Sequence, residues 1–129
     1  DYPALQKMYN LEVLSLIGNH TCTELPKDFG KLGGFPRLTE LLIQDFPLLE
    51  ELPALEDGAM KCLNTLKIWD CERAKKVPDG LERLKTLKWI DCKGRYGDAN
   101  ELMERLKEGG EDWNNIKANN PYVTISLGY

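Results

Sequence analysis

Few side chains in this 129-residue chain have the types and the spacing that catalysis needs. The single histidine, His20, stands two positions before Cys22, so a thiol nucleophile with a histidine base is conceivable. Nothing in the sequence supplies a third group to orient the histidine, or donors for an oxyanion. The sequence also lacks a Gly-x-x-x-x-Gly-Lys-Ser/Thr loop, so no ATP site is expected. We therefore expect no enzyme, no cofactor and no metal site.

The four cysteines could form two disulfides, but their spacing favours free thiols. No Cys-x-x-Cys pair occurs among them, and the histidine has no partner spaced for zinc. A core built from 21 leucines does not need the disulfides that hold small secreted domains together. We interpret the four as buried free thiols in a cytoplasmic protein: Cys22, Cys62, Cys71 and Cys92. The glycosylation triplet Asn19-His20-Thr21 would matter only in a secreted chain.

Composition describes a single water-soluble domain. The chain is 42% hydrophobic and 29% charged, with a formal net charge of −4. That charge gives no general attraction to nucleic acid or acidic lipid. No apolar run approaches the roughly 18 to 20 residues that cross a bilayer, so no membrane span is expected. The chain begins at Asp1 without a methionine, which favours a piece of a longer protein.

The elements that must position any binding residues repeat along the chain. The pattern apolar-x-x-Leu-x-x-Leu-x-Leu, with Ile or Cys at some positions, occurs four times, and its third members are 27, 25 and 24 residues apart. These third members are Leu14, Leu41, Leu66 and Ile90. A second mark begins nine residues after the last apolar residue of each of the first three patterns, at Leu25-Pro26, Leu52-Pro53 and Val77-Pro78. Two marks in register are typical of leucine-rich repeats.

The repeat predicts an α/β solenoid with a concave parallel sheet and an irregular convex side. Successive side chains of a strand point to opposite faces, so Leu14 and Leu16 should point inward while Ser15 points outward. One unit cannot bury its apolar face alone, but stacked units fuse their leucines into one core. The Leu-Pro steps suit the returning convex segments because proline cannot donate to a strand ladder. After the second strand, Phe46 should serve as a spine aromatic.

After residue 97 the repeats give way to a predicted cap, so we divide the chain into about four repeats (1–97) and a capping segment (98–129). Asp98 has Glu101 three positions on, which is typical of a helix start. An apolar stripe follows, and Gly109 with Gly110 should end that helix.

The last part of the predicted cap is a short turn or helix and then a strand. Trp113 should plug the core. Val123, Ile125 and Leu127 alternate with polar residues and should extend the sheet past the fourth strand. The amino end has no matching cap, so we expect further repeats before Asp1.

The carboxyl-terminal residues carry a family resemblance. They read Leu102-Met-Glu-Arg-Leu-Lys-Glu-Gly-Gly-Glu-Asp-Trp113-Asn-Asn-Ile116, followed by Pro121-Tyr-Val-Thr-Ile125. With the Leu-Pro repeats, this segment resembles the end of plant coiled-coil-class nucleotide-binding leucine-rich-repeat (NLR) disease resistance proteins. Such proteins often have His-Ile where this chain has Asn119-Asn120. The resemblance implies an intracellular receptor whose repeats detect a pathogen effector or an effector-modified host protein, and help to hold the resting receptor inactive.

The predicted concave face presents three columns of outward side chains. The columns are Val13, Glu40, Thr65 and Trp89; Ser15, Leu42, Lys67 and Asp91; and Ile17, Gln44, Trp69 and Lys93. Lys67 could pair with Asp91, and Trp69 should lie within cation–π reach of Lys93. Tryptophan is enriched among binding hot spots, so we expect this face to bind a protein partner or other domains of the parent chain. The alternative is that both tryptophans only cover the sheet.

Other surfaces and other functions are weaker candidates. Residues 67–95 hold nine bases and five acids, and Arg73, Lys75 and Lys76 could dock an acidic surface, although a solvated rim is the simpler interpretation. No nucleic-acid module accompanies them, so no nucleic acid partner is expected. The main alternative function is a generic leucine-rich-repeat scaffold, such as an adaptor or a ligase specificity subunit. A secreted receptor ectodomain is less favoured because no cysteine cluster marks either end.

Overall fold

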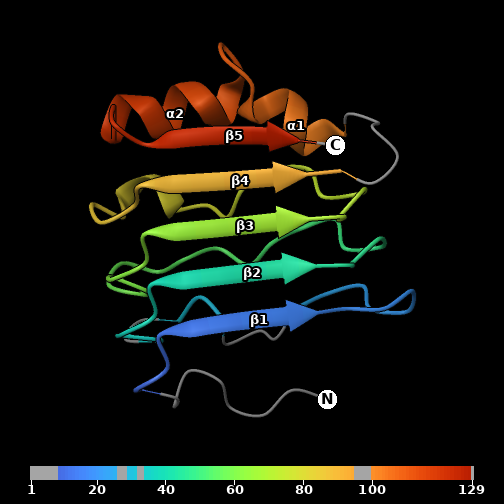
Figure 1. The fold of residues 1–129 in the computed structure, drawn as a ribbon, viewed down its shortest axis with the longest axis horizontal. Coiled ribbons are helices and arrows are strands. Elements are labelled where there is room, and N and C mark those ends of the chain that lie inside the picture. The colour runs from blue at the N-terminus through green and yellow to red at the C-terminus, as the bar shows by residue number, and fades with distance from the viewer. Residues whose placement is uncertain (1–8, 26–28, 32–33, 95–99, 129) are drawn as a thin grey trace.

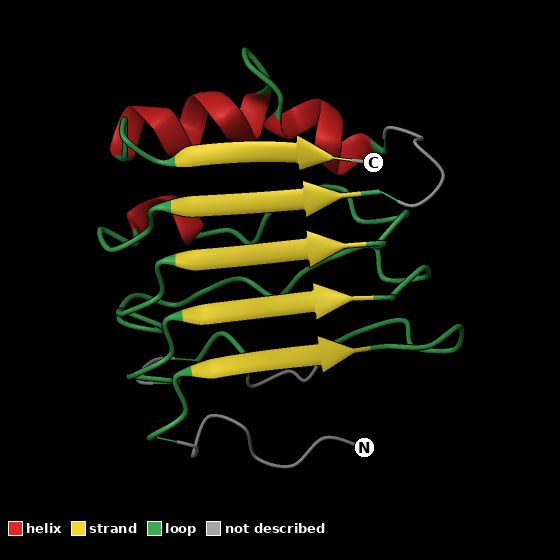
Figure 2. Ribbon diagram, in the orientation of Figure 1, coloured by secondary structure: helices red, strands yellow, loops and turns green. Residues whose placement is uncertain are grey.

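The described part of the chain folds into one parallel sheet with two helices at its carboxyl-terminal end (Figure 1). The computed structural model describes residues 9–25, 29–31, 34–94 and 100–128. The five strands follow one another across the sheet in chain order (Figure 2). They are β1 (Val13–Ile17), β2 (Glu40–Gln44), β3 (Thr65–Trp69), β4 (Trp89–Lys93) and β5 (Thr124–Gly128). The helices are the short 3₁₀ helix η2 (Leu81–Arg83), α1 (Glu101–Leu106) and α2 (Glu111–Asn119).

The strand register confirms the predicted periodicity. Leu14 pairs with Leu41, Leu41 with Leu66, and Leu66 with Ile90, so the third members of the four patterns lie side by side. The predicted last strand continues the same register, because Ile90 pairs with Ile125. The predicted α/β repeat solenoid is therefore confirmed. Its division into four repeats and a cap at residue 97 falls in the segment 95–99, outside the described residues, and stays a proposal.

Backbone hydrogen bonds extend the ladder by one residue beyond each strand. The residue that follows a strand donates its N–H to the last carbonyl of the next strand, as Asp45 does to Trp69 at 3.1 Å and Asp70 to Lys93 at 2.8 Å. Both aspartates have left-handed backbones, with φ of 61° and 56°. Aspartate tolerates this conformation better than most residues. The chain therefore leaves β2 and β3 by the same turn.

The apolar positions of the repeats form one continuous core behind the strands. Leu25, Leu52 and Val77 are all buried, which places the apolar residue of each Leu-Pro mark in the core. Phe46 is fully buried, as expected of a spine aromatic. Leu14 is only half-buried, although it packs against the core, because it lies on the edge strand β1.

The first helix of the predicted cap starts later than expected. Asn100, rather than Asp98, caps α1, since its side chain accepts the N–H of Met103 at 2.8 Å. Asp98 itself lies outside the described residues. The helix also ends before the two glycines, at Leu106. Gly110 instead begins α2, and a Cβ there would lie 2.4 Å from the carbonyl oxygen of Arg105, so only glycine fits this tight approach.

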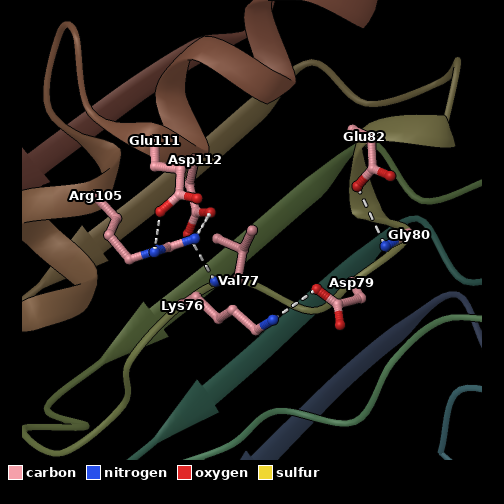
Figure 3. A network of polar contacts seen from close by, with 8 residues as sticks. All are labelled: Lys76, Val77, Asp79, Gly80, Glu82, Arg105, Glu111 and Asp112. Carbon is pink, nitrogen blue, oxygen red and sulfur yellow. Dashed lines mark hydrogen bonds and ion pairs between the residues drawn. The ribbon is translucent and has the colours of Figure 1, made fainter.

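A buried carboxylate joins α2 to the third repeat (Figure 3). Asp112 accepts the backbone N–H of Val77 at 3.0 Å and the guanidinium of Arg105 at 2.9 Å. Glu111 binds the same guanidinium from the solvent side. These contacts raise the pKa of Arg105, chiefly through its hydrogen bond to Asp112.

The predicted role of Trp113 is wrong. Its side chain is half-exposed, with the amino group of Lys117 5.9 Å from the ring centroid. The buried residues of α2 are Asp112 and Ile116. Trp113 is therefore turned away from the core by the helix, because its neighbour Asp112 takes the inward position.

Candidate protein-binding surface

The twelve predicted binding residues share one face of the sheet, which we call the open face. The register aligns them in the three predicted columns. In the view of Figure 1 the strands lie in front, and the returning segments pass behind them. Strand β5 adds a position to each column, which the sequence argument did not include: Thr124, Ser126 and Gly128. The alternation of Val123, Ile125 and Leu127 already held the signal for these three positions.

The centre of the open face is a cluster of two tryptophans and two lysines, which we call the tryptophan–lysine cluster (Lys67, Trp69, Trp89 and Lys93). The Lys67 amino group lies 5.5 Å from the ring centroid of Trp69 and 5.7 Å from that of Trp89. The amino group of Lys93 lies 4.7 Å from the Trp69 centroid, as predicted. Both distances to Trp69 are within cation–π range, so its ring has an ammonium group from each of two strands.

The predicted ion pair between Lys67 and Asp91 is wrong. Lys67 binds the carboxylate of Glu40 at 3.4 Å, across the β2–β3 pairing. Asp91 instead accepts the indole N–H of Trp69 at 3.2 Å and lies 4.0 Å from the Lys93 amino group. A lysine on a strand can reach a carboxylate on either neighbouring strand, and the indole donor already occupies the one on β4.

Two of the predicted contact residues are buried rather than available to a partner. Asp91 is covered in the arrangement just described, and its side chain is only 7% exposed. Thr65 is also buried, and its hydroxyl donates to the side-chain oxygen of Asn64 at 2.8 Å. A column assignment gives the face on which a side chain lies but not how far its neighbours cover it.

Trp89 is the more exposed of the two tryptophans. Its side chain is 39% exposed, and its indole N–H donates to the hydroxyl of Ser126 at 3.0 Å. Ser126 was missed as part of this surface, since the sequence alone did not indicate which hydroxyl would meet the indole. The hydrogen bond fixes the ring orientation while leaving part of the ring open to solvent. Rigid exposed aromatic surface is the type that binding hot spots favour.

The β1–β2 end of the open face is less charged. Val13 and Ile17 on β1 are both more than half exposed, and Leu42 on β2 is half-buried. Ser15, Gln44 and Glu40 fill the remaining positions, and Glu40 is the one charged residue among them. The open face thus changes from apolar side chains at β1 to aromatic and cationic side chains at β3 and β4.

The predicted basic rim is largely neutralised by nearby acids. Lys75 binds Glu50 at 3.2 Å and Lys76 binds Asp79 at 3.0 Å, and these hydrogen bonds raise the pKa of each lysine. These four side chains and that of Arg105 line a hollow of about 820 Å³. Arg73 is exposed. These pairs support the interpretation of a solvated rim.

The four cysteines differ in how deeply they are buried. Cys22, Cys62, Cys71 and Cys92 are all free thiols. The expectation that all four are buried is wrong, because Cys62 is exposed and Cys22 is only half-buried. Burial raises the pKa of Cys71 and of Cys92 to about 12, so these two thiols resist ionisation.

Within the residues that the structure describes, no helix is long and apolar enough to cross a bilayer.

Comparison with known proteins gives a consistent set of relatives. Probable disease resistance RPP8-like protein 4 of Arabidopsis thaliana is 36% identical over 121 residues, which are 89% of this chain. Disease resistance protein RPP8 of the same plant is 40% identical over 85 residues, which are 66% of this chain. The chain is a relative of the plant disease resistance proteins. The resemblance inferred from the repeats and the carboxyl-terminal segment is thereby confirmed.

The chain matches only a small part of each resistance protein. It spans 12% of the length of the RPP8-like protein 4 and 9% of RPP8. Probable disease resistance protein RXW24L, also from Arabidopsis thaliana, is 33% identical over 96% of this chain, and the match covers 13% of that protein. Neither a family model nor a solved structure matches the chain. What the resistance proteins do as whole molecules therefore enters only as a proposal.

Proposed function

We propose that this chain is a protein-recognition module of an intracellular plant immune receptor. In this proposal it senses a pathogen effector, or a host protein that an effector has modified, and it helps to hold the resting receptor inactive. The relationship to plant disease resistance proteins supports the immune role. The parent protein would act in the cytoplasm. Its partner would be a protein, or another domain of the same receptor, rather than a nucleic acid.

The observation that carries this proposal is the pair of oriented tryptophans on the open face. A fold that needed them only for stability would bury both, yet Trp89 is exposed and Trp69 is only half-buried. Each indole N–H has a partner within the chain, at Ser126 and Asp91, so ordering these rings on binding costs little conformational entropy. Proteins gain most of their interface energy from such aromatic anchors.

The test uses the complete receptor that contains this chain, expressed in leaves of its plant and challenged with a pathogen isolate that it resists. Trp89→Ala should change the cell-death response while the receptor accumulates normally. Loss of the response would indicate effector sensing at this face, and cell death without the pathogen would indicate a contact that keeps the receptor inactive. Tyr122→Ala is the control, because Tyr122 is an exposed aromatic residue outside the five strands, in the loop before β5. Equal responses of Trp89→Ala and the natural receptor would contradict the proposal.

A further inference from the structure

The two lysines of the tryptophan–lysine cluster differ in how available they are. Lys67 lies near both indole rings, its ammonium is held by Glu40 at 3.4 Å, and its side chain is only 21% exposed. The side chain of Lys93 is 49% exposed. Among the described residues its nearest carboxylate is that of Asp91, which is 4.0 Å away and already accepts the indole N–H of Trp69. Lys93 is therefore the cation that an incoming group can reach.

The two carboxylates beside the cluster are already partnered within the chain. Asp91 is buried and accepts the indole N–H of Trp69, and Glu40, whose side chain is 37% exposed, binds Lys67. A basic partner group at Glu40 would lie beside the like-charged ammonium of Lys67. An acidic group at Lys93 meets only the buried carboxylate of Asp91. Charge complementarity at this place on the sheet therefore favours a negatively charged partner.

The tryptophans add a second requirement to the partner. Because both indole N–H groups are used within the chain, Trp69 and Trp89 offer ring surface rather than hydrogen-bond donors. Ring surface gains most from contact with aliphatic or aromatic side chains. The cluster thus offers an accessible ammonium, that of Lys93 beside Trp69, and the exposed part of the Trp89 ring four residues earlier on the same strand.

We infer that the segment bound at this cluster carries an aspartate or glutamate and, about four residues away along an extended chain, an apolar or aromatic residue. The carboxylate accepts hydrogen bonds from the Lys93 ammonium, and the apolar side chain packs against the ring of Trp89. This inference rests on the proposed function, since it specifies the chemistry of the partner at the open face. The partner is a protein segment, because a combination of one carboxylate and one apolar side chain is available in any acidic, amphipathic stretch of polypeptide.

The test is a selection of random twelve-residue peptides, displayed on phage, against the immobilised 129-residue chain. Peptides that bind the chain but not its Trp89→Ala variant are sequenced, and the most frequent are synthesised for titration calorimetry. We expect Asp or Glu about four residues from Leu, Ile, Phe, Tyr or Trp in these peptides. Lys93→Gln should weaken their binding by about fivefold, the upper range for one partly exposed ion pair. Lys93→Glu should shift the selection toward peptides that carry Lys or Arg.

The control variant is Lys85→Gln, which removes an exposed positive charge away from the open face and should leave peptide binding unchanged. Circular dichroism melting curves establish that each variant is folded before it is used. If the Trp89-dependent peptides show no acidic enrichment, or bind Lys93→Gln as well as the natural chain, the inference about the partner is wrong while the open face remains a binding surface. If no peptide distinguishes the natural chain from Trp89→Ala, the open face itself is not the binding surface and the proposed function fails.

Discussion

At the scale of single residues, the two tryptophans of the open face differ in what the fold requires of them. Trp69 donates to a buried carboxylate, whereas Trp89 donates to a serine hydroxyl at the surface. Removing Trp69 leaves Asp91 buried with only the distant Lys93 ammonium for compensation. Removing Trp89 leaves Ser126 free to bind water. The same substitution should therefore cost stability at one position and very little at the other.

We predict that Trp89→Ala lowers the free energy of unfolding by less than about 1 kcal/mol, as surface substitutions usually do. Trp69→Ala should lower it by about 1–3 kcal/mol, because it removes a hydrogen bond to a charged, buried group. Urea unfolding followed by circular dichroism measures both. A large loss of stability in Trp89→Ala would show that this ring is part of the core and not a binding residue.

The buried thiols give a second prediction at this scale. Burial holds the pKa of Cys71 and Cys92 near 12 in the folded chain, against a reference of 9.0 for an exposed thiol. A thiol reagent at pH 8 should therefore label exposed Cys62 much faster than either of them, and should label all four in urea. Mass spectrometry of the labelled peptides identifies the sites. Fast labelling of Cys71 or Cys92 in the folded chain would contradict the packing described for β3 and β4.

The same shifts fix the direction of a pH effect. A pKa raised on folding means that the unfolded chain loses these thiol protons first, so stability falls as the pH rises from about 9 to about 12. Below pH 9 both states are protonated and these thiols contribute no pH dependence. Comparison with a Cys71→Ala, Cys92→Ala double variant separates this effect from the titration of lysines and tyrosines. The double variant should lose less stability over that range.

At the scale of the elements, the attachment of α2 depends on the carboxylate of Asp112. This group ties the start of the helix to the backbone of Val77, thirty-five residues earlier in the chain, and to Arg105 of α1. Asp112 therefore links both helices to the returning segment after β3. Glu111, its exposed neighbour, binds the same guanidinium but contacts no other element in the described structure.

We predict that Asp112→Ala lowers the free energy of unfolding by about 3 kcal/mol, since it leaves the buried N–H of Val77 without its acceptor and the Arg105 guanidinium with only exposed Glu111. Glu111→Gln is the matched control and should cost less than about 1 kcal/mol, the usual value of an exposed ion pair. Thermal or urea unfolding of the two variants measures the difference. Equal costs would mean that Asp112 does not anchor the helix.

The sequence predicted these elements better than it predicted their connections. Strand β5 and both helices lie where the patterns indicated, because hydrophobic alternation and helical spacing depend on nearby residues alone. The inward position expected for Trp113 is taken by Asp112, and Asn100 rather than Asp98 caps the helix. Which of two adjacent residues points inward depends on how a helix is rotated against the sheet. That rotation is set by contacts distant in sequence, such as the one to Val77.

At the scale of the whole molecule, stability comes from stacking one repeat on the next. Leu66 lies in the middle strand, between Leu41 and Ile90, and is almost completely buried. Each strand contacts only its neighbours, so a defect in the centre separates the repeats on either side. The register that places these residues together was predictable from spacing, because a regular repeat can stack in only one alignment. The pairing of charges on the open face was not, since each lysine had two possible carboxylates.

We predict that Leu66→Asp unfolds the chain at room temperature, because it places an uncompensated charge in the core. Leu66→Ala should instead leave a folded chain that is less stable by about 2–5 kcal/mol. Circular dichroism melting curves distinguish the two. A melting curve of Leu66→Asp that matches that of the natural chain would overturn the strand register.

The central claim is that the open face, with Trp89 near its centre, meets another protein surface in the working receptor. The most direct test is hydroxyl-radical footprinting, which compares the oxidation rate of the Trp89 side chain in the isolated chain and in the complete receptor, resting and pathogen-triggered. Our account predicts that Trp89 is protected in at least one of the two receptor states, while exposed Tyr122 on the loop before β5 serves as the reference. An oxidation rate of Trp89 that is the same in the isolated chain and in both receptor states would contradict it.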